Sequence, residues 1–158
     1  MRVAEELRYL ILAIQREGNR LLAAELRPLG VTPSQAEVVR VLRDHGPLTL
    51  TALGELLVCE TGTSPSRLVD RLVAQGLVQR DTDPADRRFL TLSLTTEGKR
   101  LSRRIIACEE RLYRTIDSLV DDHPVTPALE TLRALAGAFP AGQALARRRS
   151  QVWEPGLR

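Results

Sequence analysis

Residues 63–98 read TSPSRLVDRLVAQGLVQRDTDPADRRFLTLSLTTEG, and within this stretch the spacing of apolar residues changes once. The first part has apolar residues at helical spacing, with Pro65 near its start and Gly76 at its end, as helices begin and stop. From Leu77 onward apolar residues alternate with polar ones, as in a strand with one buried face. The second strand carries three leucines on one face, Leu90, Leu92 and Leu94. The stretch therefore predicts a helix followed by a β-hairpin.

The tip of this hairpin carries two adjacent arginines, Arg87 and Arg88. The preceding residues 83–86 read DPAD, which fits a β-turn with Asp at its first position and Pro at its second. Such a turn lifts the arginine pair away from the rest of the chain. Two interpretations stay open for these side chains: contact with a groove of DNA, or weak surface pairing with the neighbouring aspartates.

Helical periodicity dominates the rest of the sequence. The two longest helices are predicted at residues 3–27 and from residue 96 onward. Two shorter helices lie between them: VTPSQAEVVRVLRDHG, with Thr32 as its N-cap, and TLTALGELLV, capped by Thr49 or Thr51. Because two strands do not form a stable unit alone in water, the hairpin is expected to pack on these helices.

Three helices and a hairpin, with a long helix on either side, indicate a winged helix-turn-helix head with N- and C-terminal dimerisation helices. The fold class is mainly α with a small β-hairpin. The terminal helices carry more apolar surface than the head can cover, which predicts a homodimer. We expect a single domain over residues 1–139, with the winged helix at about 32–98 and dimerisation helices at about 3–27 and 96–139. A basic tail, residues 140–158, is expected to be weakly ordered.

Composition argues against several classes of protein. The 158 residues include no apolar run long enough to cross a membrane and no N-terminal export signal, so we expect a cytoplasmic protein without a membrane partner. The two cysteines and two histidines indicate no disulfide framework, metal site or cofactor, and no catalytic cluster indicates an enzyme. The net charge of +3 equals that of the tail, whose four arginines accompany one glutamate, so total charge says little about DNA.

The helix of the quoted stretch has residue types that contact duplex DNA. A helix fits the major groove, where Arg67 and Arg71 are able to donate paired hydrogen bonds to guanine. Three hydroxyl groups near the helix start suit phosphate contacts, those of Thr63, Ser64 and Ser66. Alternatives stay open, since Arg67 has Asp70 three residues on as an ion-pair partner, and a serine at a helix start is commonly only a cap.

Over residues 32–98 the sequence resembles the MarR family of bacterial transcriptional regulators. The wing pattern is Asp-x-Arg, five residues, Leu-Thr, two residues and Gly, which stands here at Asp86, Arg88, Leu94, Thr95 and Gly98. The resemblance implies a dimer with intertwined terminal helices, a recognition helix in the major groove of double-stranded DNA and a wing arginine in the minor groove. It assigns the minor-groove role to Arg88 and wing support to Asp86. Arg87 is left as a phosphate contact or a paired surface charge.

The resulting expectation is a repressor of a pseudo-palindromic operator, released by a small-molecule effector whose site the sequence does not reveal. One alternative is a winged-helix protein-interaction module without sequence-specific DNA binding. Another is a redox-sensing regulator using Cys59, just before the recognition helix, although Glu60 beside it disfavours the thiolate. Cys108 lies on the apolar stripe of the long C-terminal helix and is assigned to the core or the dimer interface. The hydroperoxide-sensing branch of the family uses a cysteine in the first helix, and residues 1–30 contain none.

Overall fold

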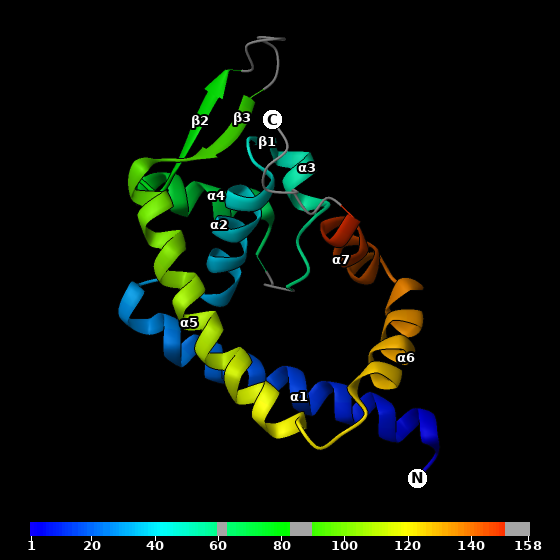
Figure 1. Ribbon diagram of the computed structural model, residues 1–158. Coiled ribbons are helices and arrows are strands. Elements are labelled where there is room, and N and C mark those ends of the chain that lie inside the picture. The colour runs from blue at the N-terminus through cyan, green and yellow to red at the C-terminus, as the bar shows by residue number, and fades with distance from the viewer. Residues whose placement is uncertain (60–62, 83–89, 151–158) are drawn as a thin grey trace, which may run out of the picture.

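The computed structural model describes residues 1–59, 63–82 and 90–150. Its elements in chain order are α1 (Val3–Leu26), the short 3-10 helix η1 (Arg27–Leu29), α2 (Pro33–His45), β1 (Leu48–Thr49), α3 (Leu50–Gly54), α4 (Pro65–Ala74), β2 (Val78–Thr82), β3 (Leu90–Leu94), α5 (Thr96–Val120), α6 (Val125–Gly137) and α7 (Pro140–Ser150). The predicted fold class, mainly α with a small β-hairpin, is confirmed (Figure 1). Within these ranges, no helix has both the length and the apolar character needed to cross a membrane.

The head of the molecule contains α2, α3, α4 and a three-stranded antiparallel sheet in the order β1-β3-β2 (Figure 1). Strands β2 and β3 form the predicted hairpin, with Val78 opposite Leu94 and Thr82 opposite Leu90. Strand β1 was not predicted, because its two residues are too few to show alternation. Leu92 and Leu94 are buried, whereas Leu90 is 56% exposed, so only two of the three leucines attach the hairpin to the head.

The hydrophobic core lies where α2, α4 and the sheet meet the first half of α5. Its central side chains have no exposed surface: Val39, Leu53, Val69, Leu72 and Ile105. Burying a side chain of this size contributes about 1.5–3 kcal/mol. Predicted caps fix the ends of the packed helices. Thr32 and Gln35 form a reciprocal capping box on α2, and Thr49 caps α3 by accepting the backbone N–H of Ala52.

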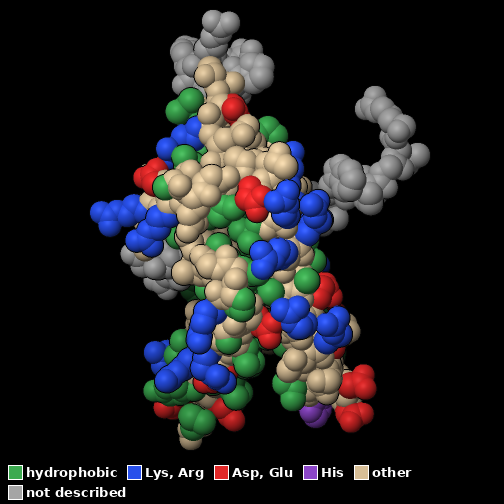
Figure 2. All heavy atoms as spheres, turned by 90° about the vertical axis from the view of Figure 1, so that its left-hand side faces the viewer, with side chains coloured by type: hydrophobic (Ala, Val, Ile, Leu, Met, Phe, Trp, Pro, Cys, Tyr) green, Lys and Arg blue, Asp and Glu red, His purple; other side chains and the backbone are tan. Residues whose placement is uncertain are grey.

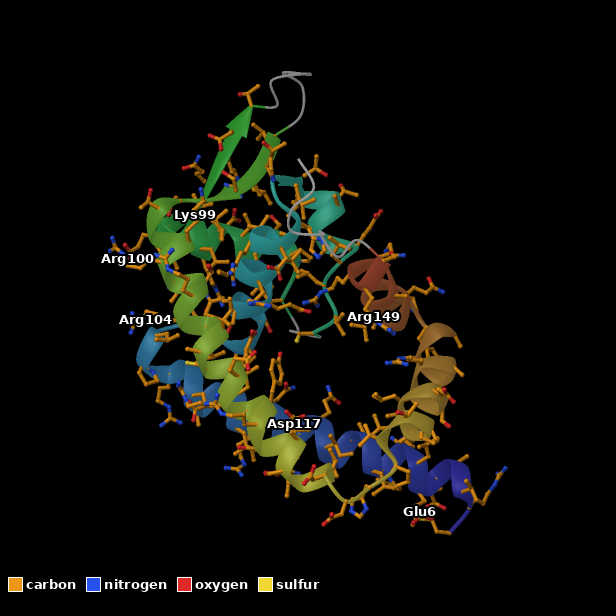
Figure 3. The ribbon with its side chains drawn as sticks, in the orientation of Figure 1. Glu6, Lys99, Arg100, Arg104, Asp117 and Arg149 are labelled. Carbon is orange, nitrogen blue, oxygen red and sulfur yellow. The ribbon has the colours of Figure 1, made fainter. Side chains whose placement is uncertain are left out.

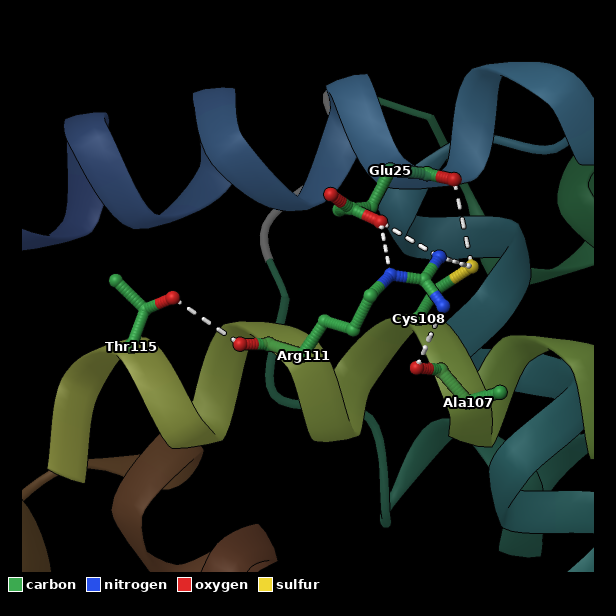
Figure 4. A network of polar contacts seen from close by, with 5 residues as sticks. All are labelled: Glu25, Ala107, Cys108, Arg111 and Thr115. Carbon is green, nitrogen blue, oxygen red and sulfur yellow. Dashed lines mark hydrogen bonds and ion pairs between the residues drawn. The ribbon is translucent and has the colours of Figure 1, made fainter. Parts of the chain in front are cut away.

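Helices α1 and α5 cross beneath the head and are joined by a polar network (Figure 4). Arg111 Nε donates a hydrogen bond to Glu25 Oε2 at 2.7 Å. Cys108 Sγ donates to the backbone carbonyl oxygen of Glu25 at 3.3 Å, and the Cys108 side chain belongs to the hydrophobic core of this chain. The structure therefore assigns Cys108 to the core, one of the two places that the sequence left open.

The C-terminal helices α6 and α7 lead from the end of α5 back to the head, where α7 lies near α3 (Figure 1). The expectation of weak order from residue 140 is wrong for residues 140–150, which form α7. Arg147 donates two hydrogen bonds to the backbone carbonyl oxygen of Glu55, and Arg148 forms an ion pair with Glu37. These contacts with distant residues stabilise a helix that has little apolar periodicity of its own, so the sequence pattern did not indicate it.

Candidate nucleic-acid interface

Helix α4 turns one face to the core and the opposite face to solvent. The buried side chains are Leu68, Val69 and Leu72. Arg67 and Arg71 are four residues apart, so they lie on one face of the helix, and both are exposed. Among the described residues, neither guanidinium has an ion-pair partner. Two free bidentate donors therefore stand side by side on this helix.

The first turn of α4 is fixed by local chemistry. Ser64 Oγ accepts the backbone N–H of Arg67 at 3.4 Å, which confirms the predicted cap, and Pro65 occupies the first helical position. Ser64 is exposed, while Thr63 and Ser66 are half-buried beside it. As a cap acceptor, the Ser64 hydroxyl retains its proton for donation. The exposed end of the helix thus combines a positive dipole end with hydroxyl donors, which suits an anion such as a phosphate.

The structure gives Asp70 a partner other than Arg67. Asp70, the partner that the sequence offered to Arg67, instead forms an ion pair with Arg80 of β2. This pair connects α4 to strand β2 of the hairpin across the surface of the head. Both side chains are substantially exposed, so the pair adds little stability, and its consequence is that Arg67 is left for other contacts.

The Leu-Thr-x-x-Gly part of the wing pattern forms the junction between the hairpin and α5. Thr95 Oγ1 accepts the backbone N–H of Gly98 at 3.0 Å and donates to the carbonyl oxygen of Gly76 at 2.7 Å. A Cβ atom at Gly98 would lie 2.0 Å from the carbonyl oxygen of Leu77, so only glycine permits this approach. The remaining part of the pattern lies outside the described residues: Asp86, Arg87 and Arg88. Their roles stay predictions.

Sequence reasoning missed the buried carboxylate of Glu37, a residue of α2 with 7% of its surface exposed. Glu37 Oε1 accepts the backbone N–H of Val58, and Oε2 accepts that of Cys59, each at 2.9 Å. Arg148 Nη1 donates to Glu37 Oε1 at 2.7 Å. The partners are 21, 22 and 111 residues away along the chain, so no local pattern indicates them. The Glu37 carboxylate of α2 thus holds Val58 and Cys59, which precede α4 in the chain.

The surroundings of Cys59 disfavour the redox alternative. Desolvation, followed by the charge and hydrogen bond of Glu37, raises the pKa of the Cys59 thiol to about 11, although the residue as a whole is exposed. Because the thiolate is the reactive form, a raised pKa lowers the reactivity of this cysteine near neutral pH. The sequence attributed the unfavourable charge to Glu60, which lies outside the described residues, and the structure attributes it to Glu37.

A pocket of about 480 Å³ lies between the end of α2, the hairpin and the first turns of α5. Three cationic side chains line it, Arg43, Lys99 and Arg103, and none of its described lining residues is acidic. Within the described chain, none of these three cations has an ion-pair partner. Lys99 marks the start of α5 in Figure 3, and Figure 2 shows Lys and Arg side chains gathered on this side of the molecule. The pocket suits an anionic molecule.

These features define a winged-helix DNA-binding protein: a capped helix with two exposed arginines that have no ion-pair partner in the described part of the chain, a hairpin fixed beside it and long flanking helices. The sequence model of the MarR family matches residues 31–89. The chain is 30% identical over 102 residues to the multiple antibiotic resistance protein MarR of Salmonella typhimurium, covering 65% of this chain and 68% of that protein. The chain belongs to the MarR family, whose members are transcriptional regulators rather than enzymes.

Solved structures agree with this assignment. A cysteine-to-serine mutant of E. coli MarR in complex with operator DNA superposes with a TM-score of 0.67 at 27% identity, covering 87% of this chain and 98% of that one. Bordetella bronchiseptica BpsR, whose DNA binding is regulated by 6-hydroxynicotinic acid, has a TM-score of 0.73 at 20% identity over 86% and 96% of the two chains. The second comparison supports the fold alone.

Proposed function

We propose that this chain forms a cytoplasmic homodimer that represses transcription by binding a pseudo-palindromic operator in double-stranded DNA. Helix α4 enters the major groove, where Arg67 and Arg71 contact base edges. The hydroxyl groups at its start contact phosphates, those of Thr63, Ser64 and Ser66. In the wing, Arg88 enters the minor groove, Arg87 contacts phosphate and Asp86 supports the turn. The observation that carries the proposal is the pair of exposed, unpaired arginines on the capped helix α4 within the described chain.

The terminal helices support the dimer. Leu26 is the only buried residue among the 24 of α1, and none of the 13 residues of α6 is buried. Large apolar side chains are exposed along both helices: Tyr9, Leu10, Ile11, Leu12, Ile14, Leu129, Leu132 and Leu135. A patch of this kind calls for a covering surface, and a second copy related by a two-fold axis brings identical faces together. The same symmetry presents two α4 helices to DNA about 34 Å apart.

The test begins with selection of the preferred operator from random duplexes by the wild-type protein. Arg67→Ala and Arg71→Ala are then compared with Arg104→Ala, which removes an exposed arginine that points outward from α5 (Figure 3). Each α4 variant is expected to weaken operator binding by about 5- to 150-fold and to relax the preference at one base pair. Arg104→Ala is expected to bind as wild type. Unchanged affinity in both α4 variants contradicts the assignment of the recognition helix.

Two further measurements separate DNA reading from a protein-interaction role. Phosphate contacts make affinity fall steeply as salt concentration rises, so the slope counts the phosphates that the protein neutralises. Arg88→Ala is expected to weaken operator binding strongly while the dimer mass and the melting temperature stay unchanged. A salt-independent interaction without preference for duplex DNA favours the protein-interaction module.

For the effector, we propose a small organic anion that binds the pocket between α2, the hairpin and α5. Its volume, about 480 Å³, lies within the usual range for small-molecule sites. The lining supplies three cations from two elements, Arg43 on α2 with Lys99 and Arg103 on α5, and the strand residues Gln79 and Ser93. An anion held there joins the wing to two helices of the same head. Its binding therefore changes the angle of the wing and, with it, the affinity for DNA.

The effector site is tested with 6-hydroxynicotinate, the acid that regulates BpsR, and with a panel of other aromatic carboxylates. We expect at least one to release operator DNA from the wild-type protein and from Arg104→Ala, whose side chain does not line the pocket. Arg103→Ala is expected to respond only at concentrations at least tenfold higher. Equal responses of Arg103→Ala and wild type contradict this location for the effector.

A further inference from the structure

The last described helix, α7, reaches the head at the segment that precedes the recognition helix. Arg147 Nη2 donates a hydrogen bond to the carbonyl oxygen of Glu55 at 2.8 Å, and its Nε donates to the same oxygen at 3.3 Å. One residue further on, Arg148 contacts the carboxylate of Glu37 at 2.7 Å. Arg147 therefore binds the backbone of the segment before α4, and Arg148 binds the side chain of Glu37, which contacts the same segment.

Glu37 connects these contacts. Its side chain is 8% exposed, and that of Arg148 is 26% exposed, so the ion pair is largely shielded from water. The two carboxylate oxygens accept the backbone N–H groups of Val58 and Cys59. A buried carboxylate is stable in its charged form when an opposite charge and hydrogen-bond donors surround it. Arg148 supplies that opposite charge, and its ion pair holds the Glu37 carboxylate beside the backbone N–H groups of Val58 and Cys59.

The position of this segment affects DNA reading because it leads directly into α4. The N-cap Ser64 follows Cys59 by only five residues. Fixing Val58 and Cys59 against α2 restrains the N-terminal end of α4. A small displacement there moves the cap hydroxyl and the Arg67 side chain relative to a DNA groove.

We infer that α7 is a clamp on the recognition helix, with Glu37 and Arg148 as its positioning residues. The clamp makes the C-terminal helices part of the DNA-reading apparatus rather than of the dimer contact alone. The expected effect on operator binding rests on the proposed function, whereas the expected effect on the backbone of Val58 and Cys59 does not. Arg149 provides a matched control on the same helix: it is exposed and has no ion-pair partner among the described residues (Figure 3).

The experiment compares five full-length proteins with wild type: Arg148→Ala, Arg148→Lys, Arg149→Ala, Glu37→Gln and the double variant of Arg148→Ala with Glu37→Gln. Hydrogen–deuterium exchange is measured at the amides of Val58 and Cys59, and affinity is measured for the selected operator. Arg148→Ala is expected to accelerate exchange at both amides at least tenfold and to weaken operator binding about tenfold. Arg148→Lys keeps the positive charge and is expected to show a smaller change than Arg148→Ala in both exchange and operator binding. Arg149→Ala is expected to leave both at wild-type values.

The double variant tests the path through Glu37 without leaving a buried charge unpaired. If Arg148 acts through Glu37, the double variant matches Glu37→Gln alone in exchange and in affinity, because the two residues form one unit. Fully additive effects overturn that path. Unchanged exchange in Arg148→Ala overturns the clamp, and faster exchange with unchanged affinity overturns its role in DNA reading. Faster exchange in a protein that binds no operator in its wild-type form leaves the clamp standing and contradicts the proposed function.

Discussion

The head and the terminal helices use their apolar residues in opposite ways. Helix α2 of the head buries seven of its 13 residues, whereas α6, which also has 13 residues, buries none. The conformation of the head is therefore specified within one chain. Helices α1 and α6 keep most of their large apolar side chains on the surface, and this surface becomes stable when another surface covers it. The difference predicts that unfolding of the head and separation of the proposed dimer are distinct events.

The largest expected effect comes from a cavity in the head. Leu72 of α4 has no exposed surface, so Leu72→Ala is expected to lower the free energy of unfolding by about 2–5 kcal/mol. The control is Leu90→Ala, which truncates a leucine that is 56% exposed and is expected to change stability by less than about 0.5 kcal/mol. Urea denaturation followed by circular dichroism measures both. Similar losses in the two variants contradict the view that the head is stabilised within one chain.

A second substitution tests the exposed face of the terminal helices rather than the core of the head. Leu132 of α6 is 40% exposed, and Leu132→Glu places a charge on the proposed dimer face. The dimer is expected to dissociate at least tenfold more readily, because the charge must lose water when the faces meet. Leu50→Glu is the matched control, since Leu50 is 38% exposed but belongs to the head. Sedimentation velocity over a range of concentrations measures the dimer, and a dimer that tolerates Leu132→Glu excludes this face of α6.

The parts of the fold that local chemistry determines were predictable from the sequence. The recognition helix is marked by the Ser64 cap, Pro65 at its first position and Gly76 just past its end, where φ is 69°. The Thr95 cap of α5 was also predictable, because it binds the backbone of Gly98 three residues on, whereas the close approach of Gly98 to Leu77 was not, because those two residues are far apart in the chain. Each predictable feature is fixed by a side chain within a few residues of the backbone that it binds.

The remaining parts depend on partners far apart in the chain. Helix α7 and the role of Glu37 follow from contacts that span 92 and 111 residues, and a single sequence contains no local trace of such contacts. The pairing of Asp70, which the sequence left open, was likewise decided by a residue distant in the chain. The helix offered Arg67 three residues earlier, but the hairpin brought Arg80 to the same carboxylate. Helical spacing indicates which side chains are close enough to form an ion pair, but the tertiary fold determines which of these pairs form.

The smallest expected effect concerns Cys59, which lies where α7 and the head meet. With its pKa raised from 9.0 to about 11, the thiol has about 100-fold less thiolate at pH 8 than an ordinary cysteine. A more basic thiolate is also more nucleophilic, by about tenfold for this shift, so the net reaction with an aromatic disulfide is expected to be about tenfold slower. In a Cys108→Ser background Cys59 is the only thiol. The same protein in guanidinium chloride gives the reaction rate of Cys59 in the unfolded chain.

The pH profile of this reaction tests whether the surroundings of Cys59 raise the pKa of its thiol in solution. The rate is expected to keep rising above pH 9 and to level off only near 11. Because folding raises the pKa of Cys59, its contribution to stability is complete below pH 9 and is lost as the pH rises towards 11. A plateau near pH 9 means that, in solution, the Cys59 thiol is neither desolvated nor held close to the Glu37 carboxylate. That result removes the barrier to thiolate formation, and it restores the redox alternative that the position of Cys59 before the recognition helix first raised.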